Sequence, residues 1–142
     1  MRYYIRSQSD FDRYKSAAFA AGDEILFKAG ETFRGQFAPS GSGSEGAPIR
    51  VSTYSDDGSR RAAIHGLGKV DAPFKLYNPS YWEIENLELT NTDGTDRDQG
   101  NLFGIRIVGE DAGPLRCIAV RNCHIHHVNG MVGEKPRGGI HV

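Results

Sequence analysis

Three similar short segments carry a basic side chain at the same position. The segments read FKL, IRI and IHV, with Lys75, Arg106 and His141 in the middle. If they are neighbouring strands, which lie about 4.8 Å apart, their outward side chains form a column. Basic groups at that spacing repel one another unless an anion lies across them, and arginine binds carboxylates through paired hydrogen bonds. The column therefore predicts a site for an anionic ligand, with an ordinary solvated basic face as the alternative.

A second group of side chains has the types that bind transition metals. His124 and His126 alternate along the segment CHIHH, so both point to the same side of one strand. His127 follows directly, and Glu88 stands at the matching place of an earlier, similar segment. Two imidazoles and a carboxylate together can hold a metal ion. The alternative is a set of exposed histidines that are hydrogen-bonded to Glu88 and Thr90.

Acids and glycines are spaced along the loop TDGTDRDQG. Asp93, Asp96 and Asp98 offer the oxygen atoms that calcium prefers, although the loop lacks the full EF-hand pattern. Asp96 and Asp98 are also candidates for the two carboxyl groups that flank a sugar–sugar bond in a glycosidase. Polar turn composition explains the same residues without a ligand. Calcium is therefore the one cofactor that this loop suggests.

These side chains are positioned by a repeated unit of alternating apolar residues. The stretch YWEIENLELTNT (81–92) matches CIAVRNCHIHHV (117–128), with Asn86 opposite Asn122. Alternation at period two indicates a strand with one buried face, and a slip of one residue would turn the apolar set outward. Asparagine tolerates the left-handed backbone that corrects such a slip. Each copy therefore predicts two short strands joined by a one-residue bend, with Trp82 facing inward.

The N-terminal residues predict a cap and not a further copy of the unit. Ser9 has the type that begins a helix, and Asp10 and Asp12 follow in the first turn, where the helix dipole favours acids. Ala18 continues the apolar helical face, and Gly22 is a natural stop. A short helix here would cover the open end of a stack of strands, whose core and edges are otherwise exposed.

Repetition of the unit predicts an all-β solenoid in a single domain, residues 1–142. Residues 1–22 form its N-terminal cap and residues 23–142 its coils. The third basic segment, IHV, ends the chain in what we expect to be a strand. We therefore expect a fragment or a natural truncation of a longer protein. Bare strand edges at an open C-terminal end predict self-association.

Composition and charge narrow the class of protein. The chain has 142 residues and a formal charge of -1, so nothing marks a nucleic-acid or membrane-surface protein. Its 18 glycines favour a turn-rich β protein. No apolar run is long enough to span a bilayer, and no stretch near Met1 looks like a signal peptide. Cys117 and Cys123 are separated by the bend, so we expect two free thiols.

The order of motifs resembles a known family of β proteins. It runs GDEILFKAGETFRGQF, a glycine- and serine-rich loop, PIRVSTY, a GLG turn, YWEIENLELTN and RNCHIHH. From about Asp23 onward this order is similar to the N-terminal half of right-handed parallel β-helix proteins of the pectate lyase-like superfamily. It is nearest to the chondroitinase B and alginate lyase type. The resemblance implies a right-handed parallel β-helix behind a short capping helix.

The resemblance also implies a carbohydrate function outside the cytoplasm, in an extracellular or periplasmic place. The expected activity is that of a polysaccharide lyase on an anionic, uronic-acid glycan. A glycoside hydrolase and a non-catalytic glycan-binding or structural module are the alternatives. Lys75, Arg106 and His141 would contact acidic sugars, and Tyr77 would stack on a sugar face. In such lyases the catalytic and calcium ligands come from middle coils, which we expect mostly beyond Val142, so no complete catalytic site is expected here.

Overall fold

β-Strands make up nearly all the regular structure of the chain. The computed structural model describes residues 1–55, 60–95, 100–129 and 138–142, and these ranges hold 12 strands and one helix. The helix, α1 (Gln8–Tyr14), lies between the first two strands. No helix in the described ranges is long and apolar enough to cross a membrane. The strands are β1 (Arg2–Ile5), β2 (Glu24–Lys28), β3 (Thr32–Arg34), β4 (Ile49–Tyr54), β5 (Ala62–His65), β6 (Phe74–Tyr77), β7 (Trp82–Glu85), β8 (Leu87–Asn91), β9 (Phe103–Val108), β10 (Ile118–Arg121), β11 (His124–Val128) and β12 (Gly138–His141).

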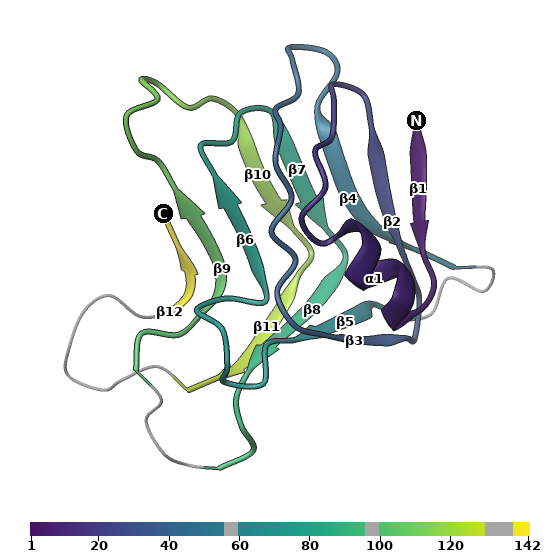
Figure 1. The fold of residues 1–142 in the computed structure, drawn as a ribbon, viewed down its shortest axis with the longest axis vertical. Helices are drawn as coiled ribbons and strands as arrows, with labels where there is room; N and C mark the ends of the chain where they lie inside the picture. The colour runs from purple at the N-terminus through teal and green to yellow at the C-terminus, as the bar shows by residue number, and fades with distance from the viewer. Residues whose placement is uncertain (56–59, 96–99, 130–137) are drawn as a thin grey trace.

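The strands form three parallel sheets (Figure 1). The first sheet has the order β1-β2-β4-β7-β10, the second β3-β5-β8-β11 and the third β6-β9-β12. From β4 onward, successive strands enter the first, second and third sheet in turn, so each strand pairs with the one three places later. This arrangement fits a β-helix-like fold, with α1 at one end of it.

The two copies of the repeated unit lie side by side in register, as predicted. Ile84 of β7 pairs with Val120 of β10. Leu89 of β8 pairs with Ile125 of β11. The copies belong to neighbouring strands of the first and second sheets, so the sequence alignment between them is also a spatial alignment.

Two asparagines form the bends between these sheets. Asn86 has a φ of 59° and Asn122 a φ of 51°, which confirms the predicted left-handed backbone. The side-chain amide of Asn122 donates to Oδ1 of Asn86 at 2.5 Å, and the amide of Asn86 donates to Oγ of Ser52 at 3.0 Å. The bends therefore stack on one another through their own side chains.

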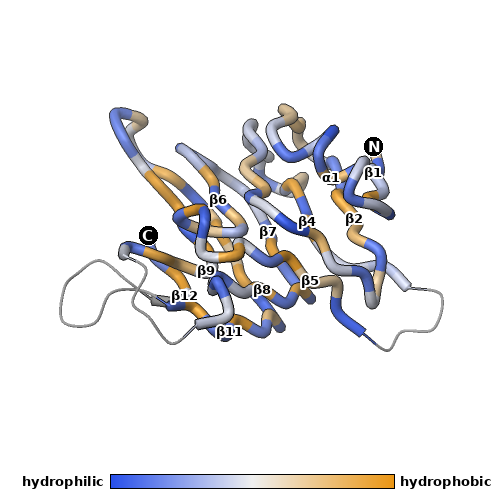
Figure 2. The backbone as a smooth tube through the Cα atoms, turned by 60° about the horizontal axis from the view of Figure 1, so that its bottom comes forward, coloured by the Kyte–Doolittle hydropathy of each residue, from blue (hydrophilic) through white to orange (hydrophobic). Residues whose placement is uncertain are grey.

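The apolar side chains on both sides of each bend face one core. Trp82, Ile84, Leu87 and Leu89 are all fully buried. Trp82 keeps its polar atom satisfied, because its Nε1 donates to the carbonyl of Gly41 at 3.0 Å. Apolar and polar residues alternate along the strands, as Figure 2 shows. Because the apolar residues face the core, the polar residues that alternate with them lie on the outer faces of the sheets.

The helix begins two residues earlier than the sequence suggested. Its N-cap is Ser7, whose Oγ accepts a hydrogen bond from the amide of Asp10 at 3.2 Å. The prediction of Ser9 as the N-cap is wrong, because Ser9 already lies inside the helix. Both serines have a side chain that can cap a helix. Only Ser7 stands three residues before Asp10, at the spacing from which a capping oxygen reaches a backbone amide.

The helix is also shorter than predicted. It ends at Tyr14, and Ala18 forms a parallel bridge with Ser40 instead of continuing the helical face. The amide of Phe19 donates to the carbonyl of Ser40 at 2.9 Å. Pairing with the segment around Ser40 therefore replaces the last expected turn, and Gly22, with a φ of 83°, turns the chain into β2.

The helix covers one end of the core. Phe11 is fully buried and stacks on Phe33, with ring centroids 5.9 Å apart. Gln8 lies beside the free edge of β3, where its Nε2 donates to the carbonyl of Arg34 at 2.8 Å. Its Oε1 accepts from the amide of Arg34 at 2.9 Å. The side chain of Gln8 thus occupies the hydrogen-bonding positions that a further strand would use.

We expect Phe11→Ala to lower the free energy of unfolding by about 3–5 kcal/mol, because it removes the buried aromatic ring that fills this end of the core. Urea denaturation measures the change, and Phe11→Leu gives a milder, still folded comparison. Arg13→Ala, on the exposed side of the same helix, is the control and should stay within about 0.5 kcal/mol. A loss below about 1 kcal/mol for Phe11→Ala would contradict a capping role.

Candidate functional site

The outer face of the third sheet brings the predicted basic residues together. Lys75 on β6 pairs in register with Arg106 on β9, and Arg106 pairs with His141 on β12. The side chains of Lys75 and Arg106 are 30% and 31% exposed, so both reach the surface. The three basic residues therefore lie side by side on neighbouring strands, and a role of this column in binding stays a prediction.

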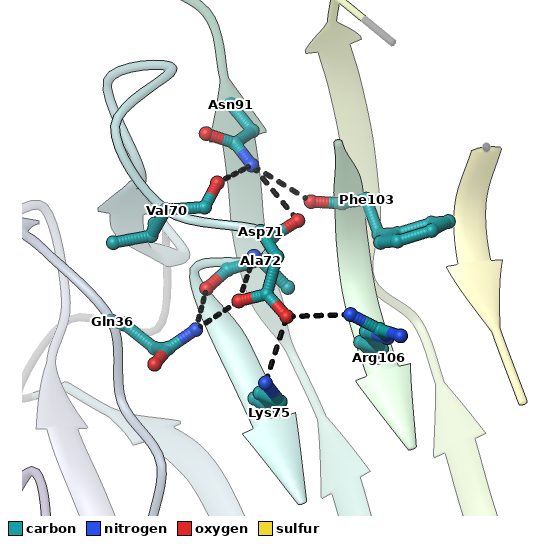
Figure 3. A network of polar contacts seen from close by, with 8 residues as sticks. All are labelled: Gln36, Val70, Asp71, Ala72, Lys75, Asn91, Phe103 and Arg106. Atoms are coloured by element: carbon teal, nitrogen blue, oxygen red, sulfur yellow. Dashed lines mark hydrogen bonds and ion pairs between the residues drawn. The ribbon is translucent and has the colours of Figure 1, made fainter. Parts of the chain in front are cut away.

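An internal anion lies across this column (Figure 3). Oδ2 of Asp71 is 2.8 Å from Nζ of Lys75 and 2.8 Å from Nη1 of Arg106. Sequence reasoning expected an external ligand to supply this charge and missed Asp71. The residue stands in the turn before β6, where no alternation or motif marks it. Repulsion between the two cations is therefore relieved within the chain itself.

The carboxylate of Asp71 is held on its other oxygen as well. Oδ1 accepts a hydrogen bond from Nε2 of Gln36 at 2.6 Å and from the amide of Ala72 at 3.1 Å. Partial burial raises the pKa of Asp71, but hydrogen bonds from Lys75, Arg106 and Gln36 outweigh it and hold the pKa below its ordinary value. The group is therefore a fixed carboxylate at neutral pH.

A buried asparagine anchors the turn that carries Asp71. Asn91, at the end of β8, is fully buried. Its Nδ2 lies 2.9 Å from the carbonyl of Val70 and 3.2 Å from those of Asp71 and Phe103. Its Oδ1 accepts from the amide of Gly68 at 3.0 Å. One amide thus joins the turn before β6 to the start of β9, and Figure 3 shows it beside the Asp71 group.

An aromatic ring lies beneath the other end of the column. Cζ of Arg106 is 5.2 Å from the ring centroid of Phe103, and the ring of His141 stacks on Phe103 at 4.6 Å. Nε of Arg106 and Nδ1 of His141 are buried without a hydrogen-bond partner in the part of the chain that the structure describes. Buried polar atoms without a partner are costly to the folded state.

Tyr77 lies two residues after Lys75 on the same face of β6. It is 55% exposed, so its ring is open to stacking. Its hydroxyl donates to Oε2 of Glu110 at 3.1 Å, and this hydrogen bond raises the pKa of Tyr77. This hydrogen bond holds the hydroxyl end of the ring beside the basic column, and stacking of Tyr77 on a sugar stays a prediction.

The acidic loop is described only in part. Asp93 turns its carboxylate back on the loop, because Oδ1 accepts from the amide of Thr95 at 2.8 Å and from its hydroxyl at 2.6 Å. Asp96 and Asp98 lie outside the described residues. The calcium site therefore stays a prediction, as does the pair of glycosidase carboxylates.

The second sheet brings the predicted histidines to the carboxylate. On its outer face Nε2 of His126 lies 2.6 Å from Oε1 of Glu88, and the ring of His124 stacks on that of His126 with centroids 4.2 Å apart.

Both cysteines are free thiols, as expected. Cys117 is exposed, whereas Cys123 packs against the core, where burial raises its pKa.

Comparison with known proteins finds similar chains. No family profile matches the sequence. A lacto-N-biosidase of Bifidobacterium longum subsp. longum is 24% identical over 84% of this chain and 10% of that protein. The crystal structure of a GH136 lacto-N-biosidase from Eubacterium ramulus has a TM-score of 0.77 and 21% identity, over 98% of this chain and 29% of that one. The crystal structure of an alginate lyase from Paenibacillus sp. str. FPU-7 has a TM-score of 0.54 and 20% identity, over 87% of this chain and 44% of that one.

These similarities establish a shared fold. The chain spans about a tenth of the curated relative and less than a third of the lacto-N-biosidase crystal structure. The predicted likeness to an alginate lyase is found, and the likeness to lacto-N-biosidases was not foreseen. The likeness to both kinds of neighbour supports a shared fold alone, because the identity is below 25% in each case.

We expect Asp71→Asn to destabilise the protein by about 1–3 kcal/mol at pH 7, because two cations lose their shared partner. The pKa of Asp71 is lower in the folded than in the unfolded chain. Its contribution is therefore fully present above about pH 4 and is lost as the pH falls through the folded-state pKa. Urea denaturation over a pH series should show the gap between the two proteins closing in acid.

Asp111→Asn is the matched control for this substitution, because Asp111 is exposed. It should change stability by less than about 0.5 kcal/mol at every pH. A gap between the native protein and Asp71→Asn that stayed constant down to the acid limit would contradict the internal ion pair.

We expect Asn91→Ala to lower the free energy of unfolding by at least about 3 kcal/mol, because several buried backbone groups lose their partner at once. Thermal and urea denaturation measure the loss. Asn101→Ala, at an exposed position, should have almost no effect. Equal stability of the two variants would show that the amide of Asn91 does not hold the turn.

Proposed function

We propose that this chain is part of a carbohydrate-active protein, most specifically a segment of a glycoside hydrolase. The observation that carries this proposal is the likeness to lacto-N-biosidases, in sequence over most of the chain and in fold over nearly all of it. In the fold that we propose, residues 23–142 are coils of a right-handed parallel β-helix and residues 1–22 are its cap, in one domain. Its partner is an oligosaccharide or polysaccharide met outside the cytoplasm.

The charge balance of the third sheet favours a neutral sugar over a uronate. Lys75 and Arg106 already share Asp71, so a uronate carboxylate would have to compete with an anion held by four hydrogen bonds. Sugar hydroxyls donate and accept, so they bind beside a carboxylate and a guanidinium without displacing either. The exposed ring of Tyr77 supplies an apolar surface for a sugar face.

A polysaccharide lyase on a uronic-acid glycan is the second candidate. It is favoured by the alginate lyase among the structural neighbours. Lyase chemistry removes the proton next to a uronate carboxylate and needs that carboxylate neutralised. Arg106 would supply the neutralising charge if the glycan displaced Asp71. The Asp71 contacts therefore count against the lyase, in addition to the likeness to lacto-N-biosidases that carries the hydrolase proposal.

Binding is tested by titrating the isotopically labelled protein with an oligosaccharide that carries lacto-N-biose and with alginate oligosaccharides. We expect the neutral sugar to shift resonances of β6 and β9 in heteronuclear NMR spectra. Tyr77→Ala should weaken its binding by about 3- to 10-fold, because one stacking contact is lost. Tyr4→Ala, on the first sheet, is the matched control and should leave the affinity unchanged. Absence of neutral-sugar binding would contradict the proposal.

Turnover is tested on the full-length protein of which this chain is a segment. Hydrolysis of a chromogenic lacto-N-bioside would support the hydrolase. Ultraviolet absorbance of an unsaturated uronate, formed from alginate, pectate or chondroitin, would support the lyase instead. Binding without any product would identify a non-catalytic glycan-binding module and would overturn the enzymatic part of the proposal.

A further inference from the structure

Three side chains of the types that can bind a metal ion project from neighbouring strands of the second sheet. Glu88 of β8 pairs in register with His124 of β11, and His126 follows two residues later on the same face. Leu89 and Ile125 pair beside them and turn inward, so the polar three are directed outward. The group lies away from the Asp71 column, which belongs to the third sheet, and plays no part in the carbohydrate function proposed above.

The distances suit a single ion. One ligand atom from each of Glu88, His124 and His126 lies within 4.8 Å of the other two. A zinc ion with bonds of about 2.0–2.1 Å holds its ligand atoms roughly 3.3 Å apart. Two of these side chains already meet, because Nε2 of His126 lies 2.6 Å from Oε1 of Glu88. Small side-chain rotations therefore bring the three atoms around one centre without moving the strands.

A fourth side chain is placed to orient one of the ligands. Nδ1 of His126 lies 2.5 Å from Nδ1 of His127, so one of these nitrogens donates a hydrogen bond to the other. In the metal-free protein Nε2–H of His126 donates to Oε1 of Glu88; with an ion in that place, Nδ1 would carry the hydrogen and the lone pair of Nε2 would face the ion. Metal-binding histidines commonly have such a partner on their second nitrogen, and it fixes both the tautomer and the ring.

The backbone at His127 is irregular in the way that produces this contact. His127 has a φ of 51°, and the pairing of β11 with β8 shifts register between Ile125 and Val128. The irregularity is a β-bulge, which redirects a side chain and is frequent beside functional sites. A left-handed histidine is also strained, and such strain concentrates at sites of function. The bulge is a second observation, independent of the ligand distances.

We propose that Glu88, His124 and His126 bind one divalent transition-metal ion of the zinc type, with His127 as a positioning residue. Two imidazoles and one carboxylate suit zinc, cobalt or nickel, whereas calcium and magnesium prefer oxygen ligands throughout. Three protein ligands leave a fourth position, and the exposed side of His124 opens it to solvent. The ion would join β8 to β11, so binding also stabilises the second sheet.

The test is a titration of the untagged, chelator-treated protein with Zn²⁺ and Co²⁺, followed by calorimetry and by the visible spectrum of cobalt. We expect one ion per chain, micromolar or tighter affinity for Zn²⁺, and no matching affinity for Ca²⁺. His124→Ala and Glu88→Gln should each weaken binding at least about 10-fold, because a ligand is lost. His127→Gly, which keeps the left-handed backbone, should weaken it by about 10- to 100-fold and alter the cobalt spectrum.

Controls separate the site from other metal-binding groups. Cys117→Ser removes the exposed thiol, the main competing ligand, and should leave the affinity unchanged. Circular dichroism of every variant checks that the strands persist. Zn²⁺ should raise the thermal midpoint of the native protein and not that of Glu88→Gln. Affinity weaker than about 100 μM, or affinity that survives both His124→Ala and Glu88→Gln, would overturn the proposal.

Discussion

The structure depends on keeping every apolar side chain on the inner face while the chain passes from one sheet to the next. Alternation alone cannot do this, because the apolar residues slip by one place at each bend. Asn86 and Asn122 correct the slip through their left-handed backbone and bond to each other through their side chains. The pairing of Ile84 with Val120 follows from this correction. The inner register therefore decides where each outward residue lies.

Outward residues that stack in register must balance their charges locally. On the third sheet Lys75 and Arg106 lie on adjacent strands, and Asp71 from the preceding turn neutralises both. On the second sheet Nε2 of His126 lies 2.6 Å from Oε1 of Glu88. The parallel sheets thus generate columns of polar groups, in which a single carboxylate contacts its neighbours.

The repeated unit could be predicted because its signals are local. Strand pairing, the bends at asparagine and the neighbours of Arg106 all follow from alternation and alignment. The start of the helix was misplaced because Ser7 and Ser9 are equally good caps in isolation. Asp71 and Asn91 could not be found from the sequence, because each acts between segments that meet only in the folded chain. Their effect depends on loop paths, which no periodicity records.

The similarity to lacto-N-biosidases extends over the whole repeated region and includes the N-terminal cap. Parallel strands paired in register present their outward side chains at fixed spacing along each sheet. The most direct measurement of the register is a double-mutant cycle between Asn86→Gly and Asn122→Gly, in which glycine keeps the left-handed backbone and removes the amides. Stacked bends predict a coupling free energy of about 0.5–1.5 kcal/mol in urea denaturation, and strictly additive effects would contradict the account.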